Sequence, residues 1–423
     1  MCGEHRIAAN LGHGSHVRLV VSEFGKLWGA GTISSLGNGI SGVAGPLLAA
    51  ALTRDPVRVA GLLVAQTTPW VLFTLPSGAV ADRMDRRRLM TLAGVVRALG
   101  LGALGLAVAL GRPGLWLLYA TFFLIGCAGV LYDNASTAVL PATVEGVGLE
   151  RANGRMYATR TLGDSLIGPP LGGWLFTTLA WLPFLLDSAA FVLVTVLSLT
   201  LSRRVGRPAV VARGTLRESI GEGLRWLLRH RLLRTIAISV AWSNLTLGAV
   251  TSVLVLYAQQ RLGLGSVGYG LLLVWIAVGG IIGGFAANRV AAALGPGTTL
   301  RVGLIIEAST HLGLALTTNA IVAGLVLGLL GLHLIVYSSI GAALRQAIAP
   351  PEMQGRVQSS YKLLSAGGML LGAGLGGVIA AWFGLTAPFW VGVVSVSALT
   401  LTVWRRLTNS AVEAARPAQP AAV

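Results

Sequence analysis

The chain alternates between long apolar runs and short polar breaks. A helix needs roughly 20 mostly apolar residues to cross about 30 Å of hydrocarbon. Twelve such runs can be delimited, at residues 27–51, 57–81, 89–110, 114–140, 158–180, 183–202, 234–258, 267–290, 299–318, 320–344, 361–382 and 386–404. We therefore predict an all-α membrane protein with twelve transmembrane helices. The ninth and tenth runs are nearly continuous, so eleven helices would also satisfy the pattern.

Composition agrees with a membrane location. Of the 423 residues, 54% are hydrophobic and 11% are charged, whereas soluble domains carry about 25% charged residues. The net charge of +17 does not indicate a nucleic-acid partner, because the basic residues stand in short clusters between apolar runs. Cys2 and Cys127 cannot form a disulfide framework, and residues 1–25 show no pattern of a removable signal peptide.

The basic residues also predict an orientation. Successive loops between the runs alternate between the two sides of the membrane. Of the 32 Lys and Arg residues, the loops on one side contain only four, namely Arg54, Arg58, Arg112 and Arg261. Lys and Arg accumulate in cytoplasmic loops. We therefore expect a multi-pass protein of the inner or plasma membrane with both termini in the cytoplasm.

The longest polar stretch divides the chain into two halves of six helices. The expected parts are a cytoplasmic N-terminus (1–26), a first bundle (27–202), a cytoplasmic linker (203–233), a second bundle (234–404) and a disordered tail (405–423). Five residues of the linker recur at helical spacing: Leu216, Ile220, Leu224, Leu227 and Leu228. They predict an amphipathic helix on the membrane surface, with arginines facing anionic headgroups. A solvated linker with a helical patch is the alternative.

The two halves repeat each other at an offset of about 205 residues. The sequence GAVADR at 78–83 ends the second run, and GFAANR at 284–289 ends the eighth. The sequence GPPLGGW at 168–174 lies in the fifth run, and GAGLGGV at 372–378 lies in the eleventh. Duplicated halves with a binding site between them are typical of secondary carriers, so the pattern favours transport, by analogy of fold.

The loop after the second run carries the strongest motif, GAVADRMDRRR at 78–88. Gly78 allows a neighbouring helix to approach closely. Asp82 lies at a helix C-terminus, where the helix dipole disfavours an anion, so it needs a cationic partner or another helix's N-terminus. We interpret it as a latch that holds the halves in one orientation. A plain basic loop is the alternative.

With these residues the chain resembles the major facilitator superfamily, whose loop after helix two reads G-x-x-x-D-R-x-G-R-[RK]. The resemblance is to the bacterial exporters that include enterobactin exporters and macrolide efflux proteins. It is carried by SSLGN at 34–38, LPSGAVADR at 75–83, Leu140-Pro141 with Ala152-Asn153, and FLLDS at 184–188. It implies two pseudo-symmetric six-helix bundles that rock about a central cavity.

The resemblance also implies roles for single residues. Asp82 and Arg86 match the motif's aspartate and its following arginine, and Asp133 matches a carboxylate that can receive that arginine. The latch set is Gly78, Asp82, Arg83, Arg86, Arg87, Asp133 and Arg97. The set Gly168, Pro169, Gly172 and Gly173 resembles the antiporter signature of helix five, with ordinary small-residue packing as the alternative. Asp85 and Asn288 depart from the motif, and Asn38 replaces an acid that relatives often carry.

Charged residues inside the runs are candidates for ion coupling, because each costs roughly 2.5–3.5 kcal/mol unless paired or hydrated. The acids are Asp133, Asp164, Asp187 and Glu307. We expect proton coupling at Asp164, or at Glu307 with His311, which lie four apart on one helix face; a structural hydrogen bond is the alternative for the pair. Asp187 is expected at the membrane interface. Asp133 and Arg97 are expected in the cytoplasmic charge network, and His333 as a satisfied interior residue.

The resulting expectation is a secondary transporter, not an enzyme, that exports a small amphipathic molecule by proton antiport. Residues that can line its cavity are Asn38, Trp70, Phe73, Tyr132, Trp242 and Tyr257. We expect a monomer with protons, substrate and lipids as partners, and no catalytic residue, metal or cofactor. No G-x-x-x-x-G-K-[ST] loop is present, which excludes an ATP-driven pump in this chain. The main alternative is a lipid or lysolipid flippase of the same fold; a haem protein using His311 and His333, or a membrane sensor, is less well supported.

Overall fold

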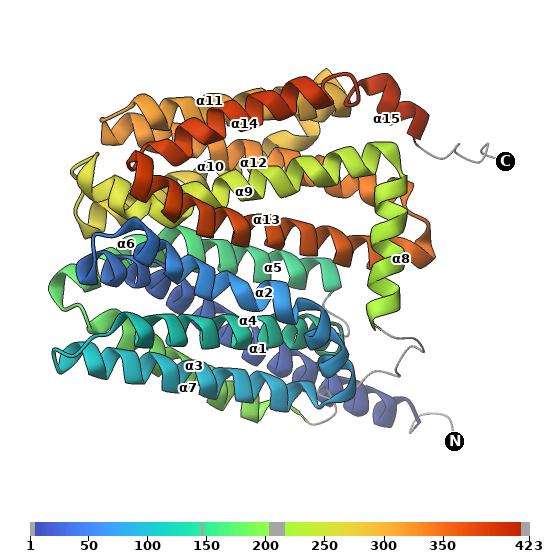
Figure 1. The fold of residues 1–423 in the computed structure, drawn as a ribbon. Coiled ribbons are helices and arrows are strands. Elements are labelled where there is room, and N and C mark those ends of the chain that lie inside the picture. Colours follow the sequence, from blue (N-terminus) through green and yellow to red (C-terminus); the bar gives the residue numbers. More distant parts are fainter. Residues whose placement is uncertain (1–4, 145–147, 203–215, 416–423) are drawn as a thin grey trace. The chain divides into compact units, whose positions relative to one another are not determined.

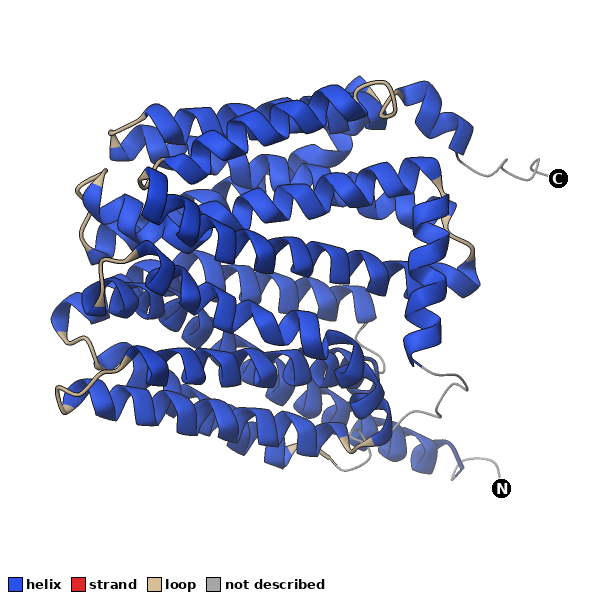
Figure 2. Cartoon of the chain, viewed as in Figure 1, coloured by secondary structure: helices blue, strands red, loops and turns tan. Residues whose placement is uncertain are grey.

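The computed structural model describes the backbone of residues 5–144, 148–202 and 216–415, and side chains in these ranges except at 5–22, 75–83 and 216–220. Within these ranges every regular element is a helix, and the helices are joined by short loops (Figure 2). This pattern is what a lipid environment requires, because a helix satisfies its own backbone hydrogen bonds.

The helices follow one another as drawn in Figure 1. In the first part of the chain they are α1 (His5–Leu52), α2 (Pro56–Arg83), α3 (Arg86–Ala109), α4 (Leu115–Thr143), α5 (Leu149–Thr161), the π-helical turn η1 (Leu162–Ile167), α6 (Gly168–Thr178) and α7 (Leu182–Thr200). In the second part they are α8 (Leu216–Arg229), α9 (Arg231–Gln260), α10 (Ser266–Leu294), α11 (Pro296–Leu316), α12 (Ala320–Ile348), the 3-10 turn η2 (Pro351–Met353), α13 (Gln354–Phe383), α14 (Ala387–Val403) and α15 (Asn409–Ala415).

All twelve expected spans are helical. Ten helices in the described residues are long and apolar enough to cross a membrane, and α14, with 17 residues, is a shorter apolar helix. The fifth span is divided into α5, η1 and α6. Asn319 separates the ninth span from the tenth, because its side chain accepts hydrogen bonds from the first N–H groups of α12 and so fixes a new helix start. This excludes the eleven-helix alternative.

The chain packs as two compact units, and their bounds differ from the expected ones. Unit 1 comprises residues 1–44 and 72–212, and unit 2 comprises residues 45–71 and 213–423. The beginning of α2 joins unit 2 because Gly377 on α13 has no side chain. A Cβ at that position would lie 2.5 Å from the Cβ of Ala60 and 2.9 Å from the carbonyl oxygen of Pro56.

The repeated glycine motif makes the same contact in each unit. In unit 1, a Cβ on Gly168 of α6 would lie 2.6 Å from the Cα of Gly39 in α1. In unit 2, a Cβ on Gly372 of α13 would lie 1.9 Å from the carbonyl oxygen of Leu245 in α9. Small residues allow membrane helices to approach with their backbones in contact. The two copies of the motif therefore hold equivalent helices together.

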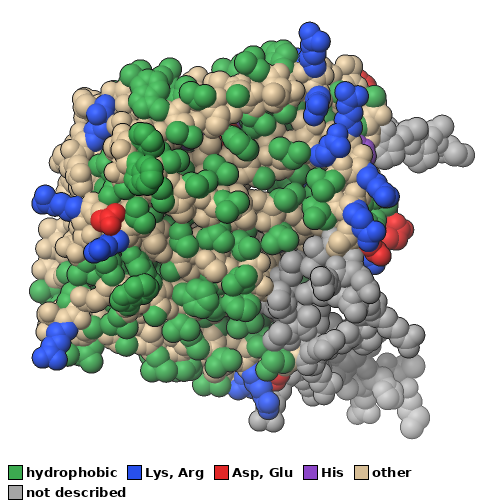
Figure 3. All heavy atoms as spheres, in the orientation of Figure 1, with side chains coloured by type: hydrophobic (Ala, Val, Ile, Leu, Met, Phe, Trp, Pro, Cys, Tyr) green, Lys and Arg blue, Asp and Glu red, His purple; other side chains and the backbone are tan. Residues whose placement is uncertain are grey.

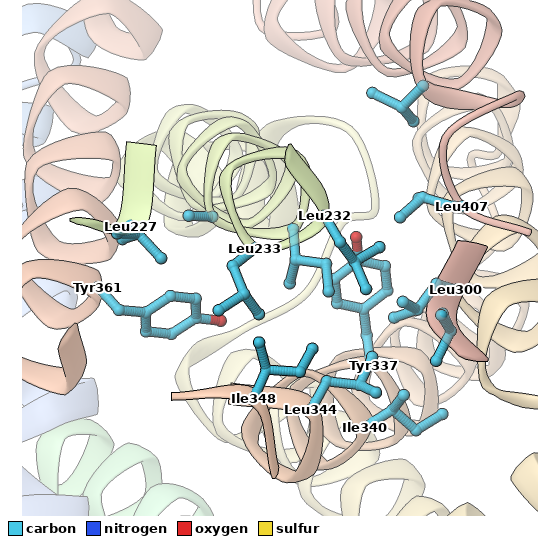
Figure 4. Close-up of a cluster of buried hydrophobic side chains, with 14 of the residues drawn as sticks. Leu227, Leu232, Leu233, Leu300, Tyr337, Ile340, Leu344, Ile348, Tyr361 and Leu407 are labelled. Carbon is cyan, nitrogen blue, oxygen red and sulfur yellow. The ribbon is translucent and has the colours of Figure 1, made fainter. Parts of the chain in front are cut away.

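The amphipathic segment of the linker forms α8, as its leucine spacing predicts. Its apolar side packs against other helices of unit 2. Leu227 is fully buried in the core cluster of Figure 4, with Leu233 of α9, Leu344 of α12 and Tyr361 of α13. Glu222 also forms a 2.6 Å ion pair with Arg356 of α13. The helix is therefore a packed part of unit 2.

The structure differs from the expected disordered tail at residues 409–415, which form α15. Val412 is buried, and the Asn409 side chain accepts a hydrogen bond from the Thr298 N–H at 3.1 Å and donates one to the Leu294 carbonyl at 2.9 Å. These contacts at the start of α11 order the segment. Residues 416–423 lie outside the described residues.

Large apolar side chains cover the exposed flanks of the helices, and Lys and Arg gather near the helix ends (Figure 3). Examples are Leu325, Leu371 and Val394, which are more than half exposed. In α10, only 28% of the apolar stretch that could cross the membrane is buried inside the protein. A soluble protein rarely exposes apolar surface on this scale, so these flanks are suited to lipid.

The glycine contact can be tested with two neighbouring positions of α13. We expect Gly372→Ala to lower the free energy of unfolding by about 1–3 kcal/mol, because the added methyl overlaps α9. Gly367→Ala is the control, since nothing lies within 4 Å of its Cβ position, and alanine favours a helix. Thermal unfolding of detergent-purified protein measures both. Equal unfolding temperatures for the two variants would contradict the packing role.

Candidate functional site

Unit 1 contains a polar cavity of about 250 Å³ between α1, α3, α4 and α5. Its lining includes Trp28, Asn38, Arg97, Tyr132, Asp133 and Arg160. A cavity with aromatic walls and a few convergent polar groups is typical of a small-molecule site. Asn38 and Tyr132, two of the expected cavity residues, are thereby placed in it.

Arg97 forms the inner wall of this cavity and is only 7% exposed. It donates a hydrogen bond to Oδ1 of Asn38, and its guanidinium lies 4.0 Å from the ring centroid of Phe191. Phe191 stands one helical turn after Asp187 on α7. Beside it, the Tyr132 hydroxyl is buried and has no hydrogen-bond partner among the described residues. Both groups can donate to a ligand in the cavity.

Arg160 holds two of the intramembrane acids. Its Nη2 lies 3.4 Å from Asp133 and its Nε lies 3.3 Å from Asp164. The expected pairing of Asp133 with Arg86 is therefore wrong. Arg86 instead donates to the carbonyl oxygen of Ala138 at 3.0 Å. Arg160 stands four residues before Asp164, a spacing that could have shown this contact in the sequence.

Asp187 lies near the start of α7, and its side chain is enclosed by neighbouring helices. It is 1% exposed and accepts a hydrogen bond from the Ser41 hydroxyl. Room for its carboxylate comes from Gly37 of α1, where a Cβ would lie 1.9 Å from Oδ1 of Asp187. The position of a residue along a helix predicts only its depth in the membrane, whereas here the glycine opposite allows the carboxylate to be enclosed.

Unit 2 holds a second buried polar cluster, centred on Glu307 of α11, which is 2% exposed. Its Oε2 accepts a hydrogen bond from Ser243 at 2.7 Å and lies 3.3 Å from Nε2 of His333. Its Oε1 accepts from Thr246 at 3.3 Å. The carboxylate is thus surrounded by donors from α9 and α12.

The predicted pairing of Glu307 with His311 is replaced by a pairing with His333. His311 is also buried, and its Nδ1 has no hydrogen-bond partner among the described residues. Glycines accommodate both imidazoles: a Cβ on Gly303 would lie 2.9 Å from His333, and one on Gly392 would lie 2.7 Å from His311. Residues four apart on a helix share a face, but contact here is made across helices.

The two clusters occupy equivalent places in the repeat. Ser243 and Thr246 stand about 205 positions after Asn38 and Ser41. In unit 1 Asn38 accepts a hydrogen bond from Arg97 of the third helix, whereas Ser41 donates to Asp187 of α7. In unit 2 Ser243 and Thr246 both donate to Glu307 of the third helix. The local sequence gives no sign of this correspondence until the halves are aligned.

The remaining candidates are distributed as follows. Gly78, Asp82 and Arg83 have side chains outside the described residues. Arg87 donates to the carbonyl oxygen of Leu199, and Asp85, which replaces the motif's glycine, accepts from the Arg87 N–H at 2.9 Å and so caps α3. Gly168, Pro169, Gly172 and Gly173 are buried in α6 directly after η1.

Tyr257 is a packing residue rather than a cavity residue. It is fully buried, its hydroxyl donates to the Leu314 carbonyl at 2.7 Å, and its ring lies 4.7 Å from that of Phe389. Trp70, Phe73 and Trp242 are at the margin of exposure, with 36–40% of their surface accessible. The π-helical turn η1, which carries Asp164, was not predicted; such turns are frequent at functional sites.

Comparison with known proteins identifies the family. A family model described as "transmembrane secretion effector" matches residues 14–420. The chain therefore belongs to this family of major facilitator transporters. It is a multi-pass membrane transporter, and family membership also agrees with the expectation that it is not an enzyme.

Two curated relatives cover most of the chain. The multidrug efflux pump Tap of Mycolicibacterium fortuitum is 26% identical over 377 residues, which cover 85% of this chain and 90% of Tap. The enterobactin exporter EntS of Escherichia coli (strain E2348/69) is 29% identical over 353 residues, which cover 82% of this chain and 83% of EntS.

Solved structures show the same fold. A bacterial homologue of the iron transporter ferroportin in an inward-facing state has a TM-score of 0.73 at 18% identity, covering 92% of this chain and 99% of its own. The nucleoside transporter NupG has a TM-score of 0.71 at 10% identity, covering 91% and 98%. At these identities the likeness concerns the fold alone, and it confirms the major facilitator architecture.

The buried charges of unit 1 can be tested by a double-mutant cycle. Asp187→Asn should lower the free energy of unfolding by roughly 3–5 kcal/mol, because it removes the buried carboxylate one helical turn from Phe191, on whose ring the charge of Arg97 lies. Adding Arg97→Gln should recover much of that loss. Asp55→Asn is the control, because its pair with Arg58 is exposed and contributes about 0–1 kcal/mol. Additive losses in thermal unfolding would show that Arg97 and Asp187 do not interact.

Proposed function

We propose that this transporter exports a small amphipathic molecule from the cell in exchange for protons. The observation that carries the proposal is the polar cavity of unit 1, with a buried cation and an unpartnered hydroxyl at its inner wall. The relatives named as a multidrug efflux pump and an enterobactin exporter support export as the direction. A drug, a siderophore or a secondary metabolite would fit this description.

The residues of the cavity suggest how a substrate binds. Arg97 and Tyr132 donate hydrogen bonds to a polar group of the substrate at the inner wall. Trp28 and Tyr157, which also line the cavity, offer aromatic surface to its apolar part. Arg160 forms ion pairs with the nearby acids Asp133 and Asp164, which reduces their repulsion of neutral or anionic groups of a substrate in the cavity.

Transport is proposed to follow alternating access by rocking of the two halves, as the repeat suggests. The loop set around Asp82, Arg86 and Arg87 would latch one orientation, and the glycine-rich α6 would provide the close helix contact. The asymmetry of Lys and Arg supports a location in the inner membrane with both termini in the cytoplasm. The protein acts as a monomer in this proposal.

Proton exchange supplies enough free energy. Export of a neutral solute against a 100-fold gradient costs about 2.7 kcal/mol. One proton that enters down about 150 mV supplies roughly 3.4 kcal/mol. A single titrating group is therefore sufficient.

Efflux assays test the direction and the coupling. Inverted membrane vesicles that contain the protein are expected to take up ethidium or enterobactin when respiration acidifies their interior, and a protonophore should abolish the uptake. Vesicles without the protein are the control. Uptake that survives the protonophore would contradict proton antiport. Movement of a fluorescent lysolipid, without movement of either small molecule, would favour the flippase alternative.

The cavity is tested by a single hydroxyl. Tyr132→Phe should lower kcat/KM for the transported probe by roughly 2- to 10-fold, because it removes one hydrogen bond worth about 0.5–1.5 kcal/mol. Thermal unfolding should not change, since this hydroxyl has no partner among the described residues. Tyr269→Phe, at a buried tyrosine of α10, should transport normally. An unaltered rate in Tyr132→Phe would remove this hydroxyl from the substrate site.

A further inference from the structure

The buried acids of the two units differ in the kind of cation that neutralises them. An arginine keeps its charge at every physiological pH. A histidine is positively charged only when it has bound a proton. An acid paired with arginine therefore needs no proton to be neutralised, whereas an acid paired with histidine does.

In unit 1 the acids face arginines. Asp133 and Asp164 share Arg160, and Asp187 stands one helical turn before Phe191, on whose ring the guanidinium of Arg97 lies. The shared arrangement leaves one negative charge in excess. The side chain of Asp133 is 35% exposed, so water can solvate the charge there, whereas Oδ1 of Asp164 is buried without a hydrogen-bond partner among the described residues. The acids of unit 1 thus lie in a cluster that contains two permanently charged arginines, Arg97 and Arg160.

Among the residues whose side chains the structure describes, no Lys or Arg forms an ion pair with Glu307 of unit 2. The titratable groups that interact with it are His311 of its own helix and His333 and Tyr337 of α12. It also accepts hydrogen bonds from the hydroxyl groups of Ser243 and Thr246 on α9. The sequence of α14 contains no charged residue, and the one charged residue of α10, Arg289, is exposed and donates to the Phe285 carbonyl.

A carboxylate and an imidazole, each 2% exposed at its side chain, are too costly to hold with an uncompensated charge. The pair is neutral when it carries one proton, either on His333 as imidazolium or on Glu307 as carboxylic acid. Loss of that proton leaves a net negative charge, and gain of a second leaves a positive one. Neutrality of this cluster therefore requires a bound proton.

We propose that the Glu307–His333 pair in unit 2 is the site that binds and releases the exchanged proton, separately from the substrate cavity of unit 1. The proton moves between water and Nε2 of His333 or Oε2 of Glu307, which lie 3.3 Å apart, and no other bond changes. His311, buried on the same helix face with a free Nδ1 among the described residues, is placed to pass the proton on. This inference rests on the proposed proton antiport and assigns its site.

Two glycines in neighbouring helices provide the space that the imidazole rings of this cluster occupy. Gly303 leaves the space occupied by the ring of His333, and Gly392 leaves the space occupied by the ring of His311. Both lie in membrane helices where a larger apolar residue would otherwise serve packing. The separation from the cavity has a consequence for transport: proton and substrate do not compete for one side chain.

The experiment uses the full chain in proteoliposomes with ethidium and enterobactin as probes and the membrane potential clamped. With an acid interior of about one pH unit, wild-type protein is expected to accumulate a probe roughly tenfold for one proton exchanged. Glu307→Gln should show no accumulation beyond that of protein-free liposomes, a ratio of about one. It should still catalyse counterflow of the probe at equal pH. Counterflow reports substrate turnover without net proton movement.

Two variants serve as controls. Asp164→Asn should keep pH-driven accumulation even if its rate falls, because Arg160 needs no proton. Glu352→Gln changes an exposed acid of η2 and should behave as wild type. The double variant Glu307→Gln/His333→Gln replaces both partners with neutral amides, and it should show counterflow without pH-driven accumulation.

The outcomes separate two failures. If neither probe responds to the pH gradient in wild-type protein, the proposed proton antiport itself fails. If wild-type protein responds and Glu307→Gln responds equally, antiport stands and this assignment is overturned. Loss of counterflow in both Glu307→Gln and the double variant, at a normal unfolding temperature, would also overturn it, because the pair would then be needed for turnover itself.

Discussion

Close approach of helices at glycine is the constraint on which this structure depends. Between helices in lipid there is no hydrophobic force comparable to that in water, so contact relies on shape and on polar groups. Gly39 and Gly168 bring α6 onto α1, and Gly372 brings α13 onto α9. The same device creates room for function, since Gly37 admits the carboxylate of Asp187 and Gly303 admits the imidazole of His333. Packing and chemistry are thus set by the same residues.

The repeat supplies a common frame that the two units use differently. Both place small polar side chains of the first helix against a charged residue of the third, at Asn38 and Arg97 in unit 1 and at Ser243 and Glu307 in unit 2. The charge has the opposite sign in the two cases. A permanent cation suits hydrogen bonding to a ligand, while an acid beside histidine suits proton exchange. Under the proposed function, the two units would thus serve different tasks on the same fold.

The sequence was sufficient for the spans and the family because both rest on local patterns. Hydropathy gave twelve helices, and the motif at 78–88 carried the resemblance. Partners across helices were not accessible in the same way. The pairing of Glu307 with His333 joins α11 to α12, and that of Asp133 with Arg160 joins α4 to α5. Helical periodicity fixes which residues share one face, but rotation and depth of a neighbouring helix decide which side chain meets them.

The size of the charge effect explains why a single buried pair can influence a whole transporter. An uncompensated ion in a low-dielectric interior costs several kcal/mol even after relaxation. A 100-fold substrate gradient corresponds to only about 2.7 kcal/mol. In its enclosed form, with Glu307 and His333 both buried, the pair is therefore favoured with one proton bound. Loss of the proton leaves a net negative charge that water must solvate, so the proposed release of the proton requires that water reach the pair.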